Sequence, residues 1–268
     1  MTRSHSISEK HPIVSMLLSS FIAVLATVAV SAIFPKGGVL ENLATGVAAL
    51  AVLLVFWWWF SPRFKGDFKP RATAKEVGLL FFPFIAFCVL AAVLSWVDAG
   101  FYFKPTTLAV TMGTSAGFAE ETWFRGLAVP IGMGFLSREK RVFSTVLITS
   151  IFFGVLHFGN VFMGAEVSVG ILQAVATTFG GIFFIAVFLR SGSVLVPIFM
   201  HGFYDWVCFV TDPTLVSGVI MVDGITLGLW LALALHVALG CIGIYLVRPA
   251  MHGKINAIWD QIWAVDTQ

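Results

Sequence analysis

The sequence predicts an all-α protein, a polytopic membrane helix bundle with about eight transmembrane helices. Of its 268 residues, 59% are hydrophobic and only 11% are charged, whereas ordinary soluble domains are about 45–50% apolar and about 25% charged. The mean hydropathy is +0.95. Apolar runs of about 20 residues, the length that crosses a bilayer as a helix, recur along the chain. We therefore expect a single membrane domain over residues 1–247.

The apolar runs give the expected positions of the helices. The first begins at Ile13 and is about 22 residues long, too long for the apolar region of a signal peptide, so we expect it to be retained. The fourth is long and contains Pro130, which removes a backbone donor and predicts a break near that residue. The predicted helices cover residues 13–34, 42–60, 77–97, 107–136, 142–162, 168–189, 193–211 and 224–247.

The basic residues predict the orientation in the membrane. Thirteen of the 16 Lys and Arg residues fall on the side of the two termini, Lys36 and Lys104 fall on the other side, and Arg125 falls within the membrane. Positive charge is enriched on the cytoplasmic side of membrane proteins. We therefore predict a multi-pass protein of the cell membrane (plasma or inner) with both termini in the cytoplasm. The lipid bilayer is an expected partner, and a nucleic acid is not.

Residues 248–268 form a separate cytoplasmic tail in this prediction. Asn256, Asp260 and Gln261 alternate there with apolar residues at helical spacing. The pattern is typical of an amphipathic helix on the membrane surface, and we assign it an anchoring role. The apolar residues are Ile255, Ile258, Trp259, Ile262 and Trp263.

A few ionisable residues lie inside the predicted helices, where charge is costly and usually functional. Glu121 and Arg125 are four residues apart in the fourth helix, so they share a face and are expected to form an ion pair. Glu120 is turned about 100° away around the helix axis. It is therefore the carboxylate left without that partner, which suits a general base. The alternative interpretation is that both glutamates only neutralise Arg125.

Histidines in two further helices lie at similar depth. His157 is in the fifth helix, and His201 is in the seventh, four residues before Asp205. We expect Asp205 to accept a hydrogen bond from His201 and fix its tautomer. Glycines near these positions allow membrane helices to approach closely, so the polar groups are expected to converge. His236 has no polar neighbour within a turn, and we interpret it as a structural residue that forms a hydrogen bond to another helix.

Three motifs occur in a fixed order. They are Glu120-Glu121-x-x-x-Arg125, Phe153-x-x-x-His157 and His201-x-x-x-Asp205. The set resembles the motifs of the CAAX protease and bacteriocin-processing family, also called Abi, over roughly residues 75–211. Asp205 occupies a position where the CAAX-processing branch has asparagine. The resemblance implies an intramembrane endopeptidase with a conical active-site cleft within the membrane.

The resemblance also implies roles for the motif residues. Glu120 is expected to activate water, with Glu121 and Arg125 as its supports. His157, His201 and Asp205 are expected to position the water and the carbonyl oxygen. The expected substrate is a membrane-associated peptide or protein, of the CAAX type or of the peptide-precursor and pheromone type.

The sequence allows alternatives for both the mechanism and the function. We favour a metal-free glutamate mechanism with no cofactor, because the Glu121–Arg125 pair leaves one carboxylate available. The alternative places Zn²⁺ between Glu120, His157 and His201, since two His and one Glu are a known catalytic zinc set. The alternative functions are a non-catalytic membrane scaffold that binds peptides in the same fold and a transporter that uses these groups as a proton relay.

Overall fold

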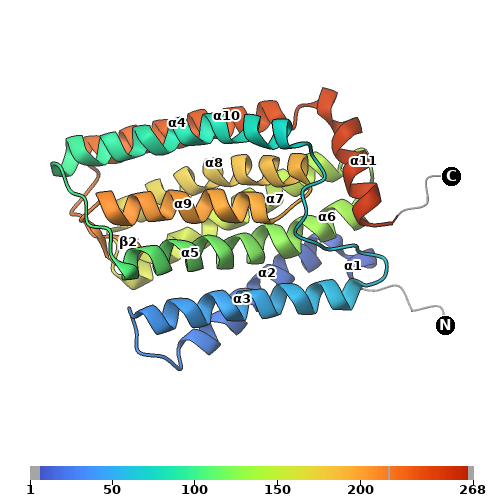
Figure 1. Ribbon diagram of the computed structural model, residues 1–268, viewed down its shortest axis with the longest axis horizontal. Coiled ribbons are helices and arrows are strands. Elements are labelled where there is room, and N and C mark those ends of the chain that lie inside the picture. The colour runs from blue at the N-terminus through green and yellow to red at the C-terminus, as the bar shows by residue number, and fades with distance from the viewer. Residues whose placement is uncertain (1–6, 217, 265–268) are drawn as a thin grey trace.

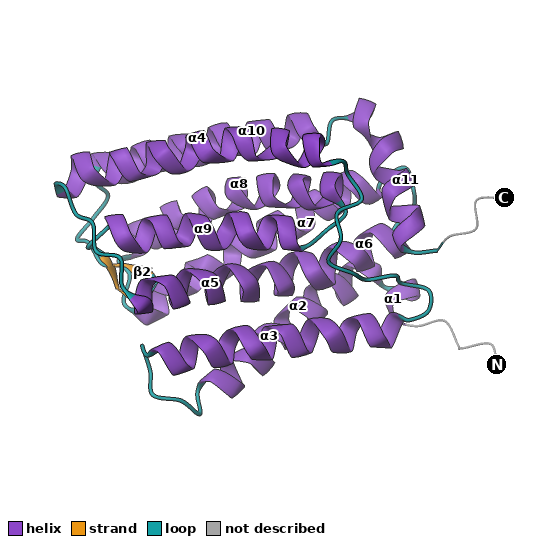
Figure 2. Cartoon of the chain, viewed as in Figure 1, coloured by secondary structure: helices purple, strands orange, loops and turns teal. Residues whose placement is uncertain are grey.

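The computed structural model describes residues 7–216 and 218–264, and it confirms the all-α fold class (Figure 2). Every predicted helix is present, with boundaries shifted by a few residues. Among the described residues, six helices are long and apolar enough to cross a membrane. The helices are α1 (Ile7–Lys10), α2 (Pro12–Ser31), α3 (Val39–Phe60), α4 (Ala74–Ala99), α5 (Thr107–Glu121), α6 (Val129–Phe135), α7 (Arg141–His157), α8 (Val167–Ser191), α9 (Leu195–Thr211), α10 (Leu227–Leu246) and α11 (His252–Ile262).

The long helices lie side by side, so the bundle has two distinct ends (Figure 1). One end carries α1 and α11, and we call it the α11 end. The other carries the short antiparallel strands β1 (Leu215–Val216) and β2 (Val219–Ile220), and we call it the hairpin end. Large apolar side chains such as Phe82 and Val97 are exposed on the outer faces. The protein is therefore a multi-pass helical membrane protein.

The fourth predicted helix does not break at Pro130. A π-helical segment, Thr122–Ala128, joins α5 to α6, and Pro130 lies in the first turn of α6. Backbone angles stay helical through the junction, with φ −63° and ψ −46° at Val129. The sequence signal was therefore correct in position, but the helix changes its winding instead of breaking.

The main apolar core lies toward the α11 end and includes residues of α11 itself. Ile255, Ile258, Trp259, Ile262 and Trp263 are all buried in it. The Trp263 indole donates to the Pro130 carbonyl at 2.9 Å. The apolar face that was expected to anchor the tail on the membrane surface therefore packs against the protein itself.

Two polar residues of α11, Asn256 and Asp260, are buried as well. Arg141, at the start of α7, donates to Asn256 Oδ1 and to Asp260 Oδ1, both at 2.6 Å. Arg138 forms a second ion pair with Asp260. Burial opposes the ionisation of Asp260, but the hydrogen bonds from Arg141 and Arg138 outweigh it and lower the pKa of this carboxyl. The arginines of the α6–α7 connection thus hold α11 in place.

Asp260→Asn is expected to destabilise the folded protein by about 3 kcal/mol at pH 7, because removing one partner leaves the Arg141 charge buried. Since folding lowers the pKa of Asp260, its contribution is complete above the unfolded-state pKa of about 3.9. That contribution is lost as pH falls through the folded-state pKa. Thermal melting in detergent at pH 7 and at pH 3 measures the difference. Gln261→Ala, on the exposed side of α11, is the control, and equal melting of Asp260→Asn and wild type at pH 7 would contradict the assignment.

Candidate active site

Close contact between α5 and α9 brings the motif residues together. The two helices touch through backbone atoms at Gly113, Gly117 and Gly202. A Cβ atom added to Gly117 would overlap the backbone of Gly202, and one added to Gly113 would lie 2.7 Å from the Trp206 nitrogen. Small residues permit such contact between membrane helices. The contact places the end of α5, with both glutamates, against the middle of α9.

The predicted ion pair between Glu121 and Arg125 is present. Arg125 Nη1 lies 3.1 Å from Glu121 Oε1, and both side chains are 0% exposed. Arg125 lies in the π-helical segment and also donates to the Gly181 carbonyl of α8 at 3.3 Å. Its guanidinium lies 4.3 Å from the centre of the Phe153 ring, a cation–π contact. The arginine therefore links α5, α7 and α8 beneath the site.

Glu121 has a second partner that the sequence did not indicate. His201 Nδ1 lies 2.8 Å from Glu121 Oε1, within hydrogen-bonding distance. Asp205 Oδ2 is 3.6 Å from His201 Nε2, which is too long for a hydrogen bond. The expectation that Asp205 fixes the His201 tautomer was therefore wrong. The close approach of α5 to α9 gives that role to Glu121, and Phe184 stacks on the imidazole ring at 4.9 Å.

Glu120 faces both histidines, away from the Glu121–Arg125 pair. Its Oε2 atom lies 3.6 Å from His157 Nε2 and 3.8 Å from His201 Nε2. This oxygen is buried and has no hydrogen-bond partner among the described residues. His157 Nδ1 is 2.9 Å from the Phe153 carbonyl, which can only accept, so Nδ1 carries the proton and Nε2 is directed at Glu120. The three groups converge as their depths predicted.

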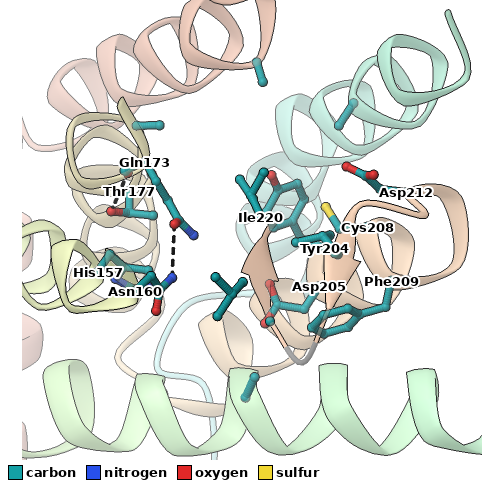
Figure 3. Close-up of a pocket in the computed structure, with 18 of the residues that line it drawn as sticks. His157, Asn160, Gln173, Thr177, Tyr204, Asp205, Cys208, Phe209, Asp212 and Ile220 are labelled. Carbon is teal, nitrogen blue, oxygen red and sulfur yellow. Dashed lines mark hydrogen bonds between the residues drawn. The ribbon is translucent and has the colours of Figure 1, made fainter. Parts of the chain in front are cut away.

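These groups line a cavity of about 560 Å³ within the bundle, a volume typical of ligand-binding sites. Figure 3 shows His157, Asn160, Gln173 and Thr177 on one wall, facing the opposite wall of α9 and the hairpin. Asp205, Tyr204, Cys208, Phe209, Asp212 and Ile220 lie on that opposite wall. Glu120 and His201 also line the cavity. The expected intramembrane cleft is therefore present around the motif residues.

Other polar lining residues were missed by sequence reasoning. Asn160 Nδ2 donates to Gln173 Oε1 at 3.0 Å, which joins the turn after α7 to α8. The signal for Asn160 was its position one turn after His157, whereas nothing in the sequence marked Gln173. His236 lines the cavity too and lies 3.4 Å from the Tyr204 hydroxyl, the interhelical contact expected of it.

The zinc alternative can be compared with the geometry of the proposed ligands. Zinc ligands from His and Glu lie about 2.0–2.2 Å from the metal in a tetrahedral arrangement. Within residues 7–216 and 218–264, no group of three or more His, Cys, Asp or Glu residues is arranged to hold a metal ion. The zinc set of Glu120, His157 and His201 stays the alternative to the metal-free mechanism.

Gly117→Ala is expected to lower the activity of this site without unfolding the protein. The added methyl group must separate α5 from α9 and so move Glu120 away from His201. A displacement of about 1 Å in a catalytic group can cost roughly a hundredfold in rate. The measurement is the turnover of folded, detergent-purified protein. Gly78→Ala is the matched control, because a Cβ at Gly78 meets nothing within 4 Å, and equal losses in both variants would contradict this role.

Comparison with known proteins finds a match over the part of the chain that carries the three motifs. Residues 102–207 match the family model described as type II CAAX prenyl endopeptidase Rce1-like. The matched segment runs from just before α5 to the last turns of α9 and includes all three motifs. No curated protein and no solved structure matches the chain.

Proposed function

We propose, on the premise that residues 102–207 match the Rce1-like family of type II CAAX prenyl endopeptidases, that Glu120 activates water for peptide-bond hydrolysis within the membrane. The substrate is a membrane-associated protein or peptide precursor. The observation that carries the proposal is the buried Oε2 of Glu120, which has no hydrogen-bond partner among the described residues and faces two imidazoles inside a cavity. A buried polar atom without a partner calls for a water molecule or a ligand group.

The chemistry begins with a water molecule beside Glu120. The separations of 3.6 and 3.8 Å between Glu120 Oε2 and the two Nε2 atoms let one water contact the carboxylate and an imidazole together. As the water attacks the scissile carbonyl carbon, Glu120 takes one of its protons. When the bond between carbon and nitrogen breaks, Glu120 gives this proton to the leaving amine. A positioned general base of this kind contributes roughly 10²–10⁴-fold to the rate.

The two histidines complete the site. His157 keeps its proton on Nδ1, so its Nε2 atom accepts a hydrogen bond from the water and orients it. His201 turns its own Nε2 into the cavity while Nδ1 is bound to Glu121. When protonated, this Nε2 donates to the developing oxyanion, and one such donor is typically worth about 3–4 kcal/mol of transition-state stabilisation. Glu121 and Arg125 hold His201 and touch no reacting atom.

The test is whether purified protein cleaves peptides or only binds them. Protein in detergent is incubated with a set of quenched fluorescent peptides, and the products are identified by mass spectrometry. Hydrolysis in water enriched in ¹⁸O should place the label in the new carboxylate of the N-terminal fragment. Peptides that bind but are recovered intact would instead favour a scaffold of the same fold, and peptides that cross sealed vesicles intact would favour a transporter.

The metal-free form of this mechanism has its own expected result. Elemental analysis of active, purified protein should find no stoichiometric zinc, and chelators should leave turnover unchanged. The reason is that the Glu120 carboxylate supplies the base and the His201 imidazole supplies the oxyanion donor. Stoichiometric zinc that is lost together with activity, and that restores activity when added back, would overturn the metal-free mechanism.

A further inference from the structure

The cavity around Glu120 extends toward only one end of the bundle. Its lining continues from Glu120 along α4 and α10 to Asp98, Thr226 and Leu229, and it includes residues of the α9–α10 hairpin. The end of α4, the start of α10 and the hairpin all lie at the hairpin end of the bundle (Figure 1). Of the residues that the structure describes, none in the loops at the α11 end lines the cavity. A substrate that approaches through the cavity therefore comes from the hairpin end.

The opposite route is closed by packed side chains. Beneath Glu120 lie Glu121 and Arg125, both without solvent exposure. Farther toward the α11 end, the π-helical segment and α6 contribute Leu127, Val129 and Met133 to the main core. That core is covered at its end by α11, whose Trp259 side chain is fully buried. Opening a path from the α11 end would require separating this core.

Charge distinguishes the two ends in relation to the membrane. The α11 end has dense basic loops, with Arg63, Lys65, Lys69 and Arg71 in the connection between α3 and α4 alone. The hairpin end has only two basic residues, Lys36 and Lys104, beside five acidic ones. The acidic residues are Glu41, Asp98, Glu166, Asp212 and Asp223. Basic loops are retained on the cytoplasmic side, so the hairpin end faces away from the cytoplasm.

We propose that the substrate enters from the extracytoplasmic face and is a peptide segment exposed there, not a chain end presented from the cytoplasm. This inference rests on the proposed function and adds the direction of access to it. The chemical class of substrate follows from the compartment. It is a precursor or membrane-protein segment that has already been translocated, or that lies in the outer leaflet.

Cysteine labelling tests the direction of access without any need for activity. Cys88, Cys208 and Cys241 are free thiols and are first replaced by alanine. Val222→Cys then places a thiol on the cavity lining at the hairpin end, and Lys140→Cys places one at the α11 end. A membrane-impermeant maleimide should label Val222→Cys in intact cells and Lys140→Cys only after permeabilisation. The reverse pattern would overturn the proposal.

A second experiment separates direction from catalysis. An impermeant quenched peptide, selected for cleavage in detergent, is added to sealed right-side-out and inside-out membrane vesicles. Right-side-out vesicles should cleave it at least tenfold faster, and detergent should abolish the difference. Attaching a bulky maleimide at Val222→Cys should block cleavage.

The Glu120→Gln variant makes the two possible failures distinct. Cleavage that depends on Glu120 but occurs in inside-out vesicles would refute the direction of access and leave the proposed function intact. Cleavage in detergent that does not depend on Glu120 would refute the proposed function. In that case the labelling pattern still decides which compartment the cavity faces.

Discussion

Glu120→Gln is expected to reduce peptide hydrolysis by roughly a thousandfold, within the range of general acid–base catalysis. The amide keeps the shape of the carboxylate but cannot take a proton from water. The 22% exposed side chain of Glu120 forms no ion pair with Arg125, so the variant should fold like the wild type. Initial rates with a quenched peptide, normalised to folded protein by size-exclusion chromatography and thermal melting, give the comparison.

The control for Glu120→Gln removes a carboxylate outside the site. Asp223→Asn changes an exposed residue at the hairpin end and should leave the rate within about twofold of wild type, since surface substitutions are usually mild. If well-folded Glu120→Gln retained full activity, Glu120 would not be the base, and the enzymatic interpretation of the site would be lost.

Arg125→Leu is expected to have the largest effect on stability, about 3–5 kcal/mol of destabilisation. The substitution removes the cation that pairs with Glu121 and leaves that carboxylate fully buried with His201 as its remaining partner. It also removes the donor to Gly181 and the contact with Phe153. Thermal melting in detergent, followed by tryptophan fluorescence, measures the change.

Two comparisons isolate the buried charge as the cause. Glu121→Gln combined with Arg125→Leu removes both charges and should recover part of the lost stability. Arg63→Leu breaks the ion pair between Arg63 and Glu9, in which the arginine side chain is 69% exposed. This change should lower the free energy of unfolding by no more than about 1 kcal/mol. Equal melting temperatures for Arg125→Leu and Arg63→Leu would show that the buried pair does not stabilise the fold.

The parts of the site that sequence could predict are those fixed by a single helix. Glu121 and Arg125 are neighbours because of the helical repeat, so their pairing followed from spacing. The helices themselves followed from the lengths of the apolar runs. The convergence of Glu120 with His157 and His201 was expected only from approximate depths, and its distances required the packed bundle.

The parts that sequence could not predict depend on contacts between helices. Glu121 binds His201 in place of Asp205 because glycines bring α5 against α9. The amide pair of Asn160 and Gln173 joins residues from two helices whose relative rotation is not encoded in local spacing. In α11, an apolar stripe has the same pattern whether it covers lipid or protein. Only the partner Arg141 distinguishes the two cases.

The docking of α11 has a practical consequence for shortened forms of the protein. A chain ended at residue 247 would keep every membrane-crossing helix and all three motifs, yet it would lose Ile255, Trp259 and Trp263 from the core. Arg141 would lose its carboxylate partner at the same time. The minimal folding unit therefore extends through α11, and tags or fusion partners belong after residue 264 so that the last helix stays seated.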